Sequence, residues 1–518
     1  MIDASMQAGP SRPTEDQSRQ QYAKRKQEYI ELERNVQASD ELLTSLASYL
    51  SNFQNDLSAV SGHVADLQQK SDAIEARLRG RKTILPPLNA LLNDITIPPA
   101  LVLTIRDTLP AQNPDLWLTA ISQLDDKIQI CQSRGKVAAA QEMESVIDGL
   151  RAKALIQLPP FLLSLIRPLR SASKGISTNL AVLQTSLLLK YQPFYAFLLR
   201  NSPKTAKQVE RGYVIAARSY YETALRRYTR ALAVIKARTA DNDTINLQYA
   251  KVEEEGEAVL LYMADDKDFR LPLEGLFRSL LLVLLDNASA EYTFVVRFFA
   301  APASEGQEPD LREADRIWHE VFDPALESCD AFIQSLLLLP PPAIPLLTLI
   351  RLNDRVIDLA EFRGANPLIS FLQKQKLTLW PLYRKDVDGR VDELKRLVVD
   401  AEGKGLAGFM GKGVKDAAVR QVATKYAVLF SATVALSSEA DDMMVFSSMT
   451  RLRNELVKLI NVQAGKLKAN QQSYLSTIFE VVMHELVSGP GATTHPKLQA
   501  ELSYFRTREE EARRRIVA

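Results

Sequence analysis

The sequence has few cysteines, few histidines and almost no net charge. Its 518 residues include two cysteines, Cys131 and Cys329, four histidines, and a formal net charge of +1 at pH 7. Two cysteines so far apart do not make a disulfide framework, which favours a reducing compartment. A net charge near zero offers no broad basic field, so the composition argues against nucleic acid as a partner.

The sequence also shows neither the pattern of a signal peptide in its first residues nor a long uninterrupted apolar run. Residues 1–16 are polar and contain proline, without the charged-then-apolar layout of a secretory signal. No window reaches about 18 uninterrupted apolar residues. Prolines interrupt residues 336–350, and residues 276–285 are short and include Arg278. We therefore expect any membrane association to be peripheral or through partners.

Strand signals are weak, and helical periodicity dominates the chain. The sequence predicts an all-α fold, with a long N-terminal coiled-coil helix followed by a rod of stacked helical bundles. Gly80, Pro86 and Pro87 predict the end of the first helix, and the proline pair at 159–160 predicts a second boundary. Helices predicted farther along include residues 341–375, 376–402 and 440–487. The predicted organisation is a disordered tail at 1–13, an N-terminal coiled coil at 14–85, a helical connector at 86–158, a helical bundle region at 159–300 and a C-terminal helical bundle region at 301–518.

The most informative stretch, residues 39–80, is predicted to be one amphipathic helix with a narrow apolar stripe. Apolar residues recur there at steps of three or four, which places them on one side of a helix. The predicted partner-binding seam consists of Leu46, Tyr49, Phe53, Leu57, Val60, Val64, Leu67, Ile74 and Leu78. A stripe this narrow is typical of a coiled coil rather than of a globular-core helix. Steps of 4, 4 and 3 from Tyr49 predict a stutter, which would locally unwind the supercoil.

A seam about 60 Å long cannot bury itself within one helix. One interpretation is assembly with helices from other chains, which we favour. A second is a helix that folds back on its own chain. A third is a self-associating scaffold or cytoskeletal rod, which needs only a second copy.

The glycine-rich segment at 403–413 partly matches a phosphate-binding loop. That template requires a glycine, four intervening residues, a second glycine, then lysine and a hydroxyl residue. Lys412 follows Gly411, but Leu406 stands at the first glycine and Gly413 stands where the hydroxyl belongs. We therefore expect no cofactor here, and a nucleotide-binding enzyme stays a disfavoured alternative.

Two other motifs of enzymes are also incomplete. The pairs at 319–320 and 484–485 begin like zinc-protease helices, but Asp323 and Ser488 occupy the positions of the second histidine. Ser171 precedes a lysine by three residues, without any accompanying motif of serine–lysine enzymes. We expect no metal site and no catalytic residues, and we predict that the protein is not an enzyme.

Arginines and tyrosines alternate within residues 218–230. Tyr221 and Tyr228 follow the buried-stripe spacing, whereas Arg226 and Arg230 fall on another face that we expect to be solvated. An acidic partner protein or an anionic membrane remains an alternative for this basic face.

Several blocks between residues 45 and 300 resemble a known family. They are Phe53, Gln54, Asn55, Asp56 and Leu57; Leu67; Leu78, Arg79, Gly80 and Arg81; Ile97, Pro98, Pro99, Ala100, Leu101 and Val102; Leu189, Lys190 and Tyr191; Phe194, Tyr195, Phe197, Leu198 and Leu199; Tyr213, Val214, Tyr220 and Tyr221; Pro272, Leu273 and Glu274; Leu276, Phe277, Arg278 and Ser279; Leu284, Leu285, Asp286 and Asn287; Glu291, Tyr292, Phe298 and Phe299. In this order they resemble the family of vacuolar protein sorting subunit fifty-two, a component of the Golgi-associated retrograde protein (GARP) tethering complex.

The resemblance implies a helical rod whose N-terminal coiled coil bundles with sister subunits in a hetero-oligomer. It implies capture of endosome-derived vesicles at the trans-Golgi network, assistance to SNARE pairing and contact with a Rab-type small GTPase. The expected location is cytoplasmic, peripheral on trans-Golgi network and endosome membranes. A sister complex in endosomal recycling shares this subunit, and the resemblance does not separate the two.

Overall fold

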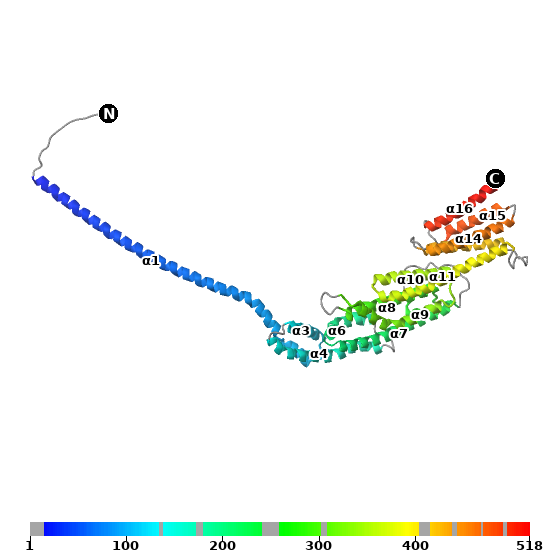
Figure 1. The fold of residues 1–518 in the computed structure, drawn as a ribbon, viewed down its shortest axis with the longest axis horizontal. Coiled ribbons are helices and arrows are strands. Elements are labelled where there is room, and N and C mark those ends of the chain that lie inside the picture. The colour runs from blue at the N-terminus through cyan, green and yellow to red at the C-terminus, as the bar shows by residue number, and fades with distance from the viewer. Residues whose placement is uncertain are drawn as a thin grey trace, which may run out of the picture. The chain divides into compact units, whose positions relative to one another are not determined.

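The computed structural model describes residues 15–133, 138–171, 180–240, 258–301, 308–403, 415–437, 443–467, 470–489 and 495–517. Within these ranges every regular element is a helix and no strand occurs, so the predicted all-α class is confirmed (Figure 1). The chain divides into two compact units, residues 1–97 and residues 98–518. Among the described residues, the first unit contains one helix and the second contains all the others.

The helix of the first unit, α1 (Glu15–Ile95), is 81 residues long. At about 1.5 Å per residue, this corresponds to about 120 Å. Its polar faces carry ion pairs one turn apart, between Asp66 and Lys70 at 2.7 Å and between Glu75 and Arg79 at 2.6 Å. In both pairs the acid precedes the base, which is the favourable order in a helix. These pairs support the helix locally but cannot bury its apolar stripe.

Helix α1 does not end at Gly80 or Pro86, as the sequence predicts, but continues to Ile95. A glycine costs a helix interior about 1 kcal/mol relative to alanine, which weakens the helix without ending it. Pro86 and Pro87 each remove a backbone N–H donor, and α1 bends in its C-terminal part (Figure 1). In the turn before them, the Thr83 hydroxyl donates to the carbonyl oxygen four residues earlier at 2.6 Å.

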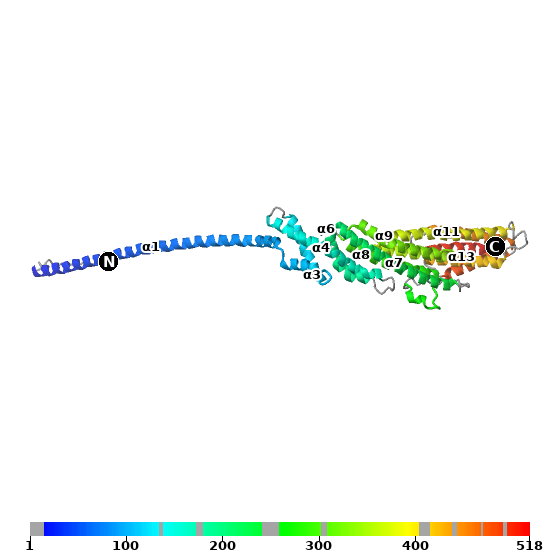
Figure 2. The ribbon, with the colours of Figure 1, turned by 90° about the horizontal axis from the view of Figure 1, so that it is seen from below.

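The second unit is a stack in which each helix packs against near neighbours along the chain (Figures 1 and 2). Contacts run from α3 and α4 through α7, α9, α8, α10 and α11 to α14, α15 and α16. The predicted stack of helical bundles is therefore confirmed for this unit. Its helices are α2 (Pro99–Asp107), α3 (Pro114–Ser133), α4 (Ala138–Ser171), α5 (Leu180–Val182), η2 (Leu183–Leu188), η3 (Leu189–Tyr191), α6 (Gln192–Asn201), α7 (Pro203–Ala240), η4 (Leu261–Ala264), α8 (Leu273–Phe298), α9 (Leu311–Leu336), α10 (Ala343–Phe362), α11 (Asn366–Ala401), α13 (Asp416–Ala435), α14 (Met443–Lys466), α15 (Gln471–Ser488) and α16 (Pro496–Val517).

The stack has an apolar core of its own. Trp117 on α3, Phe277 on α8 and Trp318 on α9 have no solvent-exposed surface. The ring of Trp318 stacks on Phe322 with centroids 5.0 Å apart, and Phe322 lies 4.5 Å from the ring of Tyr221 on α7. Such aromatic layers combine a large buried area with a specific geometry. The second unit thus closes this core without help from another chain.

Three predicted boundaries in the second unit are wrong. The proline pair at 159–160 lies inside α4, because packing against α7 outweighs the lost hydrogen bonds. The break predicted after residue 375 occurs at Gly364, whose φ of 69° ends α10 as glycine commonly ends helices. The single helix predicted at 440–487 is two helices, α14 and α15. Next to the start of α15, the Asn470 N–H donates to the carbonyl oxygen of Leu467 at 2.9 Å.

Candidate assembly interface

The nine residues of the predicted seam lie uncovered on α1. Their exposed fractions range from 47% for Val64 to 71% for Tyr49. The first unit contains no second helix in its described part, so nothing within that unit packs on the seam. Folding-back within the unit, one of the alternatives left open by the sequence, is therefore not what the described residues adopt. The assembly role of these side chains stays a prediction.

Because α1 is continuous, the apolar positions along it can be counted in steps of seven. Two rows result, displaced by three residues, as in the two seam positions of a coiled coil. From residue 43 onward the first row is Leu43, Leu50, Leu57, Val64, Leu78, Leu85 and Leu92, with Ser71 at its one gap; Tyr22, Tyr29 and Val36 precede it at the same spacing. The second row is Leu46, Phe53, Val60, Leu67, Ile74, Leu88 and Ile95, with Arg81 at its one gap.

This register removes the predicted stutter. Leu50 fills the position between Leu46 and Phe53 that the sequence interpretation gave to Tyr49. Tyr49 then lies beside the seam, at the flanking position before Leu50. The supercoil needs no local unwinding, because the seven-residue spacing continues from Leu43 to Ile95 without an inserted residue.

The uninterrupted helix also lengthens the seam. The rows add six residues to the predicted seam: Leu43, Leu50, Leu85, Leu88 and Leu92, which are exposed, and Ile95, which is half-buried. From Leu43 to Ile95 the two rows extend for about 80 Å. Each large apolar side chain that becomes fully buried contributes about 1.5–3 kcal/mol. The seam is thus the largest uncovered source of association free energy on α1.

By length and composition alone, three helical stretches could cross a membrane: Ser18–Asp107, Gln141–Pro168 and Leu273–Phe298. The last is α8, which packs against α9 and α10 and buries most of its apolar stretch in the stack. The first joins α1 to α2 across the non-helical residues 96–98 and is the least buried. Its exposed apolar residues include those of the seam.

The remaining candidate sites provide no arrangement for catalysis in the described part of the chain. His319 Nδ1 lies 3.0 Å from Asp323 Oδ1 on the exposed face of α9, and no group of three His, Cys, Asp or Glu among the described residues could hold a metal ion. The glycine-rich segment, apart from Gly403, and Lys174 lie outside the described residues.

The basic and aromatic faces of α7 are separated as predicted. Tyr221 and Tyr228 are buried, whereas Arg226 and Arg230 are exposed. Arg226 pairs with Glu222 one turn earlier on the same helix. The aromatic residues therefore belong to the core, and this prediction is confirmed.

A buried carboxyl group, which the sequence interpretation missed, joins three elements of the second unit. Glu291 on α8 accepts hydrogen bonds from Gln184 Nε2 at 2.6 Å, from the Tyr213 hydroxyl at 2.8 Å and from the Tyr221 hydroxyl at 3.0 Å. Gln184 lies on the π-helical turn η2, and both tyrosines lie on α7. Burial raises the pKa of Glu291 to about 7, although the three donors favour the ionised form. The cluster contains no nucleophile beside a base, so its chemistry is that of a structural tie.

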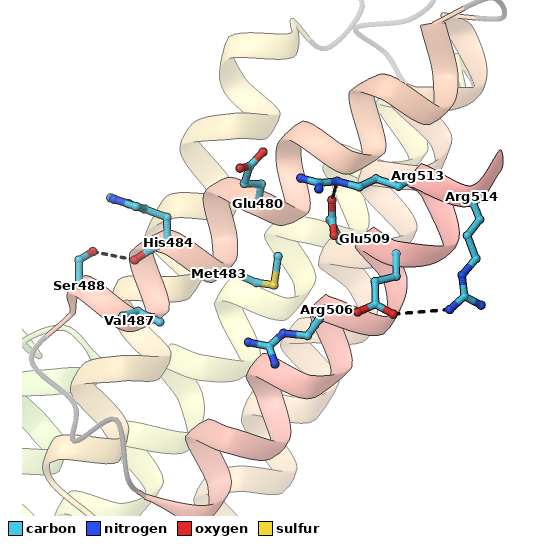
Figure 3. A pocket seen from close by; sticks show the side chains of 10 residues that line it. Glu480, Met483, His484, Val487, Ser488, Arg506, Glu509, Arg513 and Arg514 are labelled. Carbon is cyan, nitrogen blue, oxygen red and sulfur yellow. Dashed lines mark hydrogen bonds and ion pairs between the residues drawn. The ribbon is translucent and has the colours of Figure 1, made fainter. Parts of the chain in front are cut away.

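A surface groove between α15 and α16 carries both charges (Figure 3). Arg513 pairs with Glu509, and Arg514 lies 3.8 Å from Glu510. The charged lining residues are Glu480, Arg506, Glu509, Glu510, Arg513 and Arg514. Since cations and carboxylates balance, the groove selects neither an anionic nor a cationic ligand.

Comparison with known proteins gives a consistent result along the chain. Residues 21–198 match the family model described as "Vps52/Sac2 family, coiled-coil", and residues 228–508 match that described as "Vps52, C-terminal". The chain is 25% identical over 497 residues to the human protein named vacuolar protein sorting-associated protein 52 homolog, covering 90% of this chain and 65% of the relative.

Two further relatives extend this likeness. The dog homolog is 24% identical over the same shares of both chains. The Saccharomyces cerevisiae protein named vacuolar protein sorting-associated protein 52 is 20% identical over 529 residues, covering 87% of this chain and 80% of the relative. The chain thus spans about 65% of the length of its mammalian relatives. No solved structure matches it.

Proposed function

Because the chain belongs to the Vps52/Sac2 family, we propose that it is a subunit of a multi-subunit vesicle-tethering complex. In this proposal the complex acts in retrograde transport from endosomes to the trans-Golgi network. The chain assembles with sister subunits through the seam of α1, and the assembled complex assists SNARE-dependent fusion. The names of the relatives, which concern vacuolar protein sorting, support a role in protein transport.

The observation that carries the proposal is the uncovered seam. Unit two encloses its own core, whereas α1 exposes two rows of large apolar side chains along most of its length. Exposed apolar stripes of this size are rare on proteins that work alone. Helices from other chains, set alongside α1, would bury both rows in the manner of a coiled coil.

The proposal extends to location and to further partners. We place the protein in the cytoplasm, peripheral on trans-Golgi network and endosome membranes, with a Rab-type small GTPase and SNARE proteins as partners of the complex. These parts rest on the family resemblance, and α1 provides only the assembly surface.

The test is co-purification of the intact tagged chain from its own cells, followed by mass spectrometry of what accompanies it. Replacing Phe53 and Leu57 by Asp places two charges on the seam, and we expect sister subunits to be lost from the purified material. A matched control replaces Asn55 and Gln69 by Asp, since both lie on the side of α1 away from the seam. Retention of the sister subunits by the Phe53→Asp/Leu57→Asp variant would disprove the assembly role.

Light scattering of the isolated chain separates this function from a self-associating rod. A subunit of a hetero-oligomer should be poorly soluble alone and rescued by co-expression with its partners. A well-behaved homodimer that the same two aspartates dissociate would instead support a scaffold role.

A further inference from the structure

Arg81 interrupts the second apolar row of α1. It lies seven residues after Ile74 and seven before Leu88, so it occupies a seam position. The apolar rows resume beyond it at Leu85 and Leu88, both exposed. A helix that covers the seam on both sides of Arg81 must therefore pass directly over its guanidinium group.

The helix itself offers this cation no counter-charge. Side chains three and four residues away are the ones that share a face with Arg81, and these are Arg77, Leu78, Ile84 and Leu85. By contrast, the neighbouring Arg79 on another face is paired with a carboxylate at 2.6 Å. A guanidinium group covered by a second helix without a carboxylate would lose its hydration uncompensated.

The proline pair gives a second reason to expect a covering helix here. Pro86 and Pro87 cannot donate backbone hydrogen bonds, so α1 gains less from its own backbone at this point than elsewhere. Nevertheless it remains helical for two further turns, which carry Leu88 and Leu92 in the same register. Burial of these leucines by another helix would stabilise the continuation.

We propose that a partner helix accompanies α1 across the proline pair as far as Ile95 and presents an aspartate or glutamate to Arg81. Arg81 then selects the partner, because only a helix with a carboxylate in that layer can cover the seam there. This inference rests on the proposed function and adds the chemistry of the partner to it. It also disfavours a second copy of this chain, since a parallel in-register pair would bring Arg81 against Arg81.

An anionic membrane is the other class of surface that could attract this region, which also contains Arg77, Arg79 and Lys82. The apolar residues after Arg81 favour a helix instead. Leu85, Leu88, Leu92 and Ile95 continue both rows of the seam at the same seven-residue spacing, with Ile84 and Leu91 beside the first row, so a helix that covers the seam before Arg81 can cover it after Arg81 in the same register. Binding to lipid is therefore one outcome of the test that would overturn the proposal.

The test uses the full-length tagged chain and the co-purification described above. Arg81→Glu should lower the yield of sister subunits at least tenfold, whereas Arg81→Lys, which keeps the charge, should retain most of it. The control Arg79→Glu makes the same charge change outside the seam and should stay within twofold of the unsubstituted chain. Leu88→Asp should lose the sister subunits as completely as the Phe53→Asp/Leu57→Asp variant. Circular dichroism of each purified variant checks that helix content is unchanged.

Arg81→Leu adds a complementary readout. It removes the charge from an otherwise apolar row, so light scattering should show more self-association than for the unsubstituted chain. An unchanged molar mass, with sister subunits retained, would contradict the selecting role of Arg81.

The outcomes separate this inference from the proposed function. If the unsubstituted chain captures no sister subunit, or if Phe53→Asp/Leu57→Asp captures them normally, the proposed function fails. If that variant loses them but Arg81→Glu and Leu88→Asp do not, only this inference fails. Equal losses of sister subunits in Arg81→Glu and Arg79→Glu would also overturn this inference. So would a chain that sediments with phosphatidylserine-containing vesicles, if Arg81→Glu abolishes that sedimentation but still captures the sister subunits.

Discussion

Replacing Glu291 by Gln should change the pH dependence of stability in the second unit. Glu291 is fully buried and accepts hydrogen bonds from Gln184, Tyr213 and Tyr221. Glutamine keeps the size of the side chain and one acceptor oxygen, and it cannot ionise. The substitution therefore tests the cost of a buried negative charge without leaving a cavity.

The sign follows from the direction of the pKa change. Burial raises the pKa of Glu291 to about 7, above the ordinary value of 4.5 for a glutamate side chain. Between these values the folded state holds a proton that the unfolded state has released, so stability falls as pH rises through this window. Below this pH window Glu291 is protonated in both states and costs no stability, and above the window the cost of the buried negative charge is constant. Each pH unit between the two pKa values corresponds to about 1.4 kcal/mol, so the free-energy cost of burying the ionised carboxylate is of order 3 kcal/mol at high pH.

Hydrogen exchange of peptides from α8, measured between pH 5 and 8 and corrected for intrinsic rates, reports local stability in this layer. In the unsubstituted chain, the free energy of opening should fall as pH rises from about 5 to about 7. In Glu291→Gln the fall should disappear, and at pH 8 the variant should be the more stable of the two. Glu222→Gln is the control, because Glu222 lies on the surface of α7 and pairs with Arg226. An unchanged pH slope in Glu291→Gln, or lower stability than the unsubstituted chain at pH 8, would refute the reasoning.

Two further pairs of substitutions test the register of α1 and a helix end. Leu50→Asp should reduce capture of sister subunits at least tenfold, whereas Tyr49→Asp should leave most of it. Co-purification checks this, and the reverse result would restore the stutter. Gly364→Ala should destabilise the junction of α10 and α11 by about 1–2 kcal/mol, since its φ of 69° is unfavourable for residues with a Cβ. Gly389→Ala lies inside α11, with no atom within 4 Å of the added Cβ, and should instead stabilise α11 by up to about 1 kcal/mol. Hydrogen exchange of peptides from α10 and α11 measures the effect of both glycine substitutions.

The seam of α1 could be predicted from the sequence because helical periodicity is a local property. Steps of three and four fit both Tyr49 and Leu50, so that spacing alone does not decide between them. Only the longer repeat, with Leu43, Leu50, Leu57 and Val64 seven residues apart, distinguishes the two. That signal is present in the sequence, and it becomes compelling once the helix is known to be continuous.

Other features could not be predicted, because they depend on contacts between distant parts of the chain. The prolines at 159–160 look like a helix end in the sequence, but α4 continues through them, and Leu158 and Leu162 on either side are buried in the packed unit. Glu291 lies in a strongly apolar segment, and Gln184, which donates to it, is 107 residues away. A carboxylate in such a segment has no local partner in the sequence, so its burial is visible only in the folded chain.

Affinity and selectivity of the seam must come from different residues. The leucine rows would attract any amphipathic helix with the same seven-residue repeat, because apolar burial is proportional to area and has no direction. They therefore drive association without choosing a partner. The positions that can choose are those where the rows are interrupted, at Ser71 and Arg81, since a small or charged residue in a seam restricts what can lie opposite. Ser71 leaves room that a large opposing side chain can fill, and Arg81 requires a carboxylate. These two interruptions fix the register of any helix that meets both requirements, which the apolar rows alone would leave free to slide by seven residues.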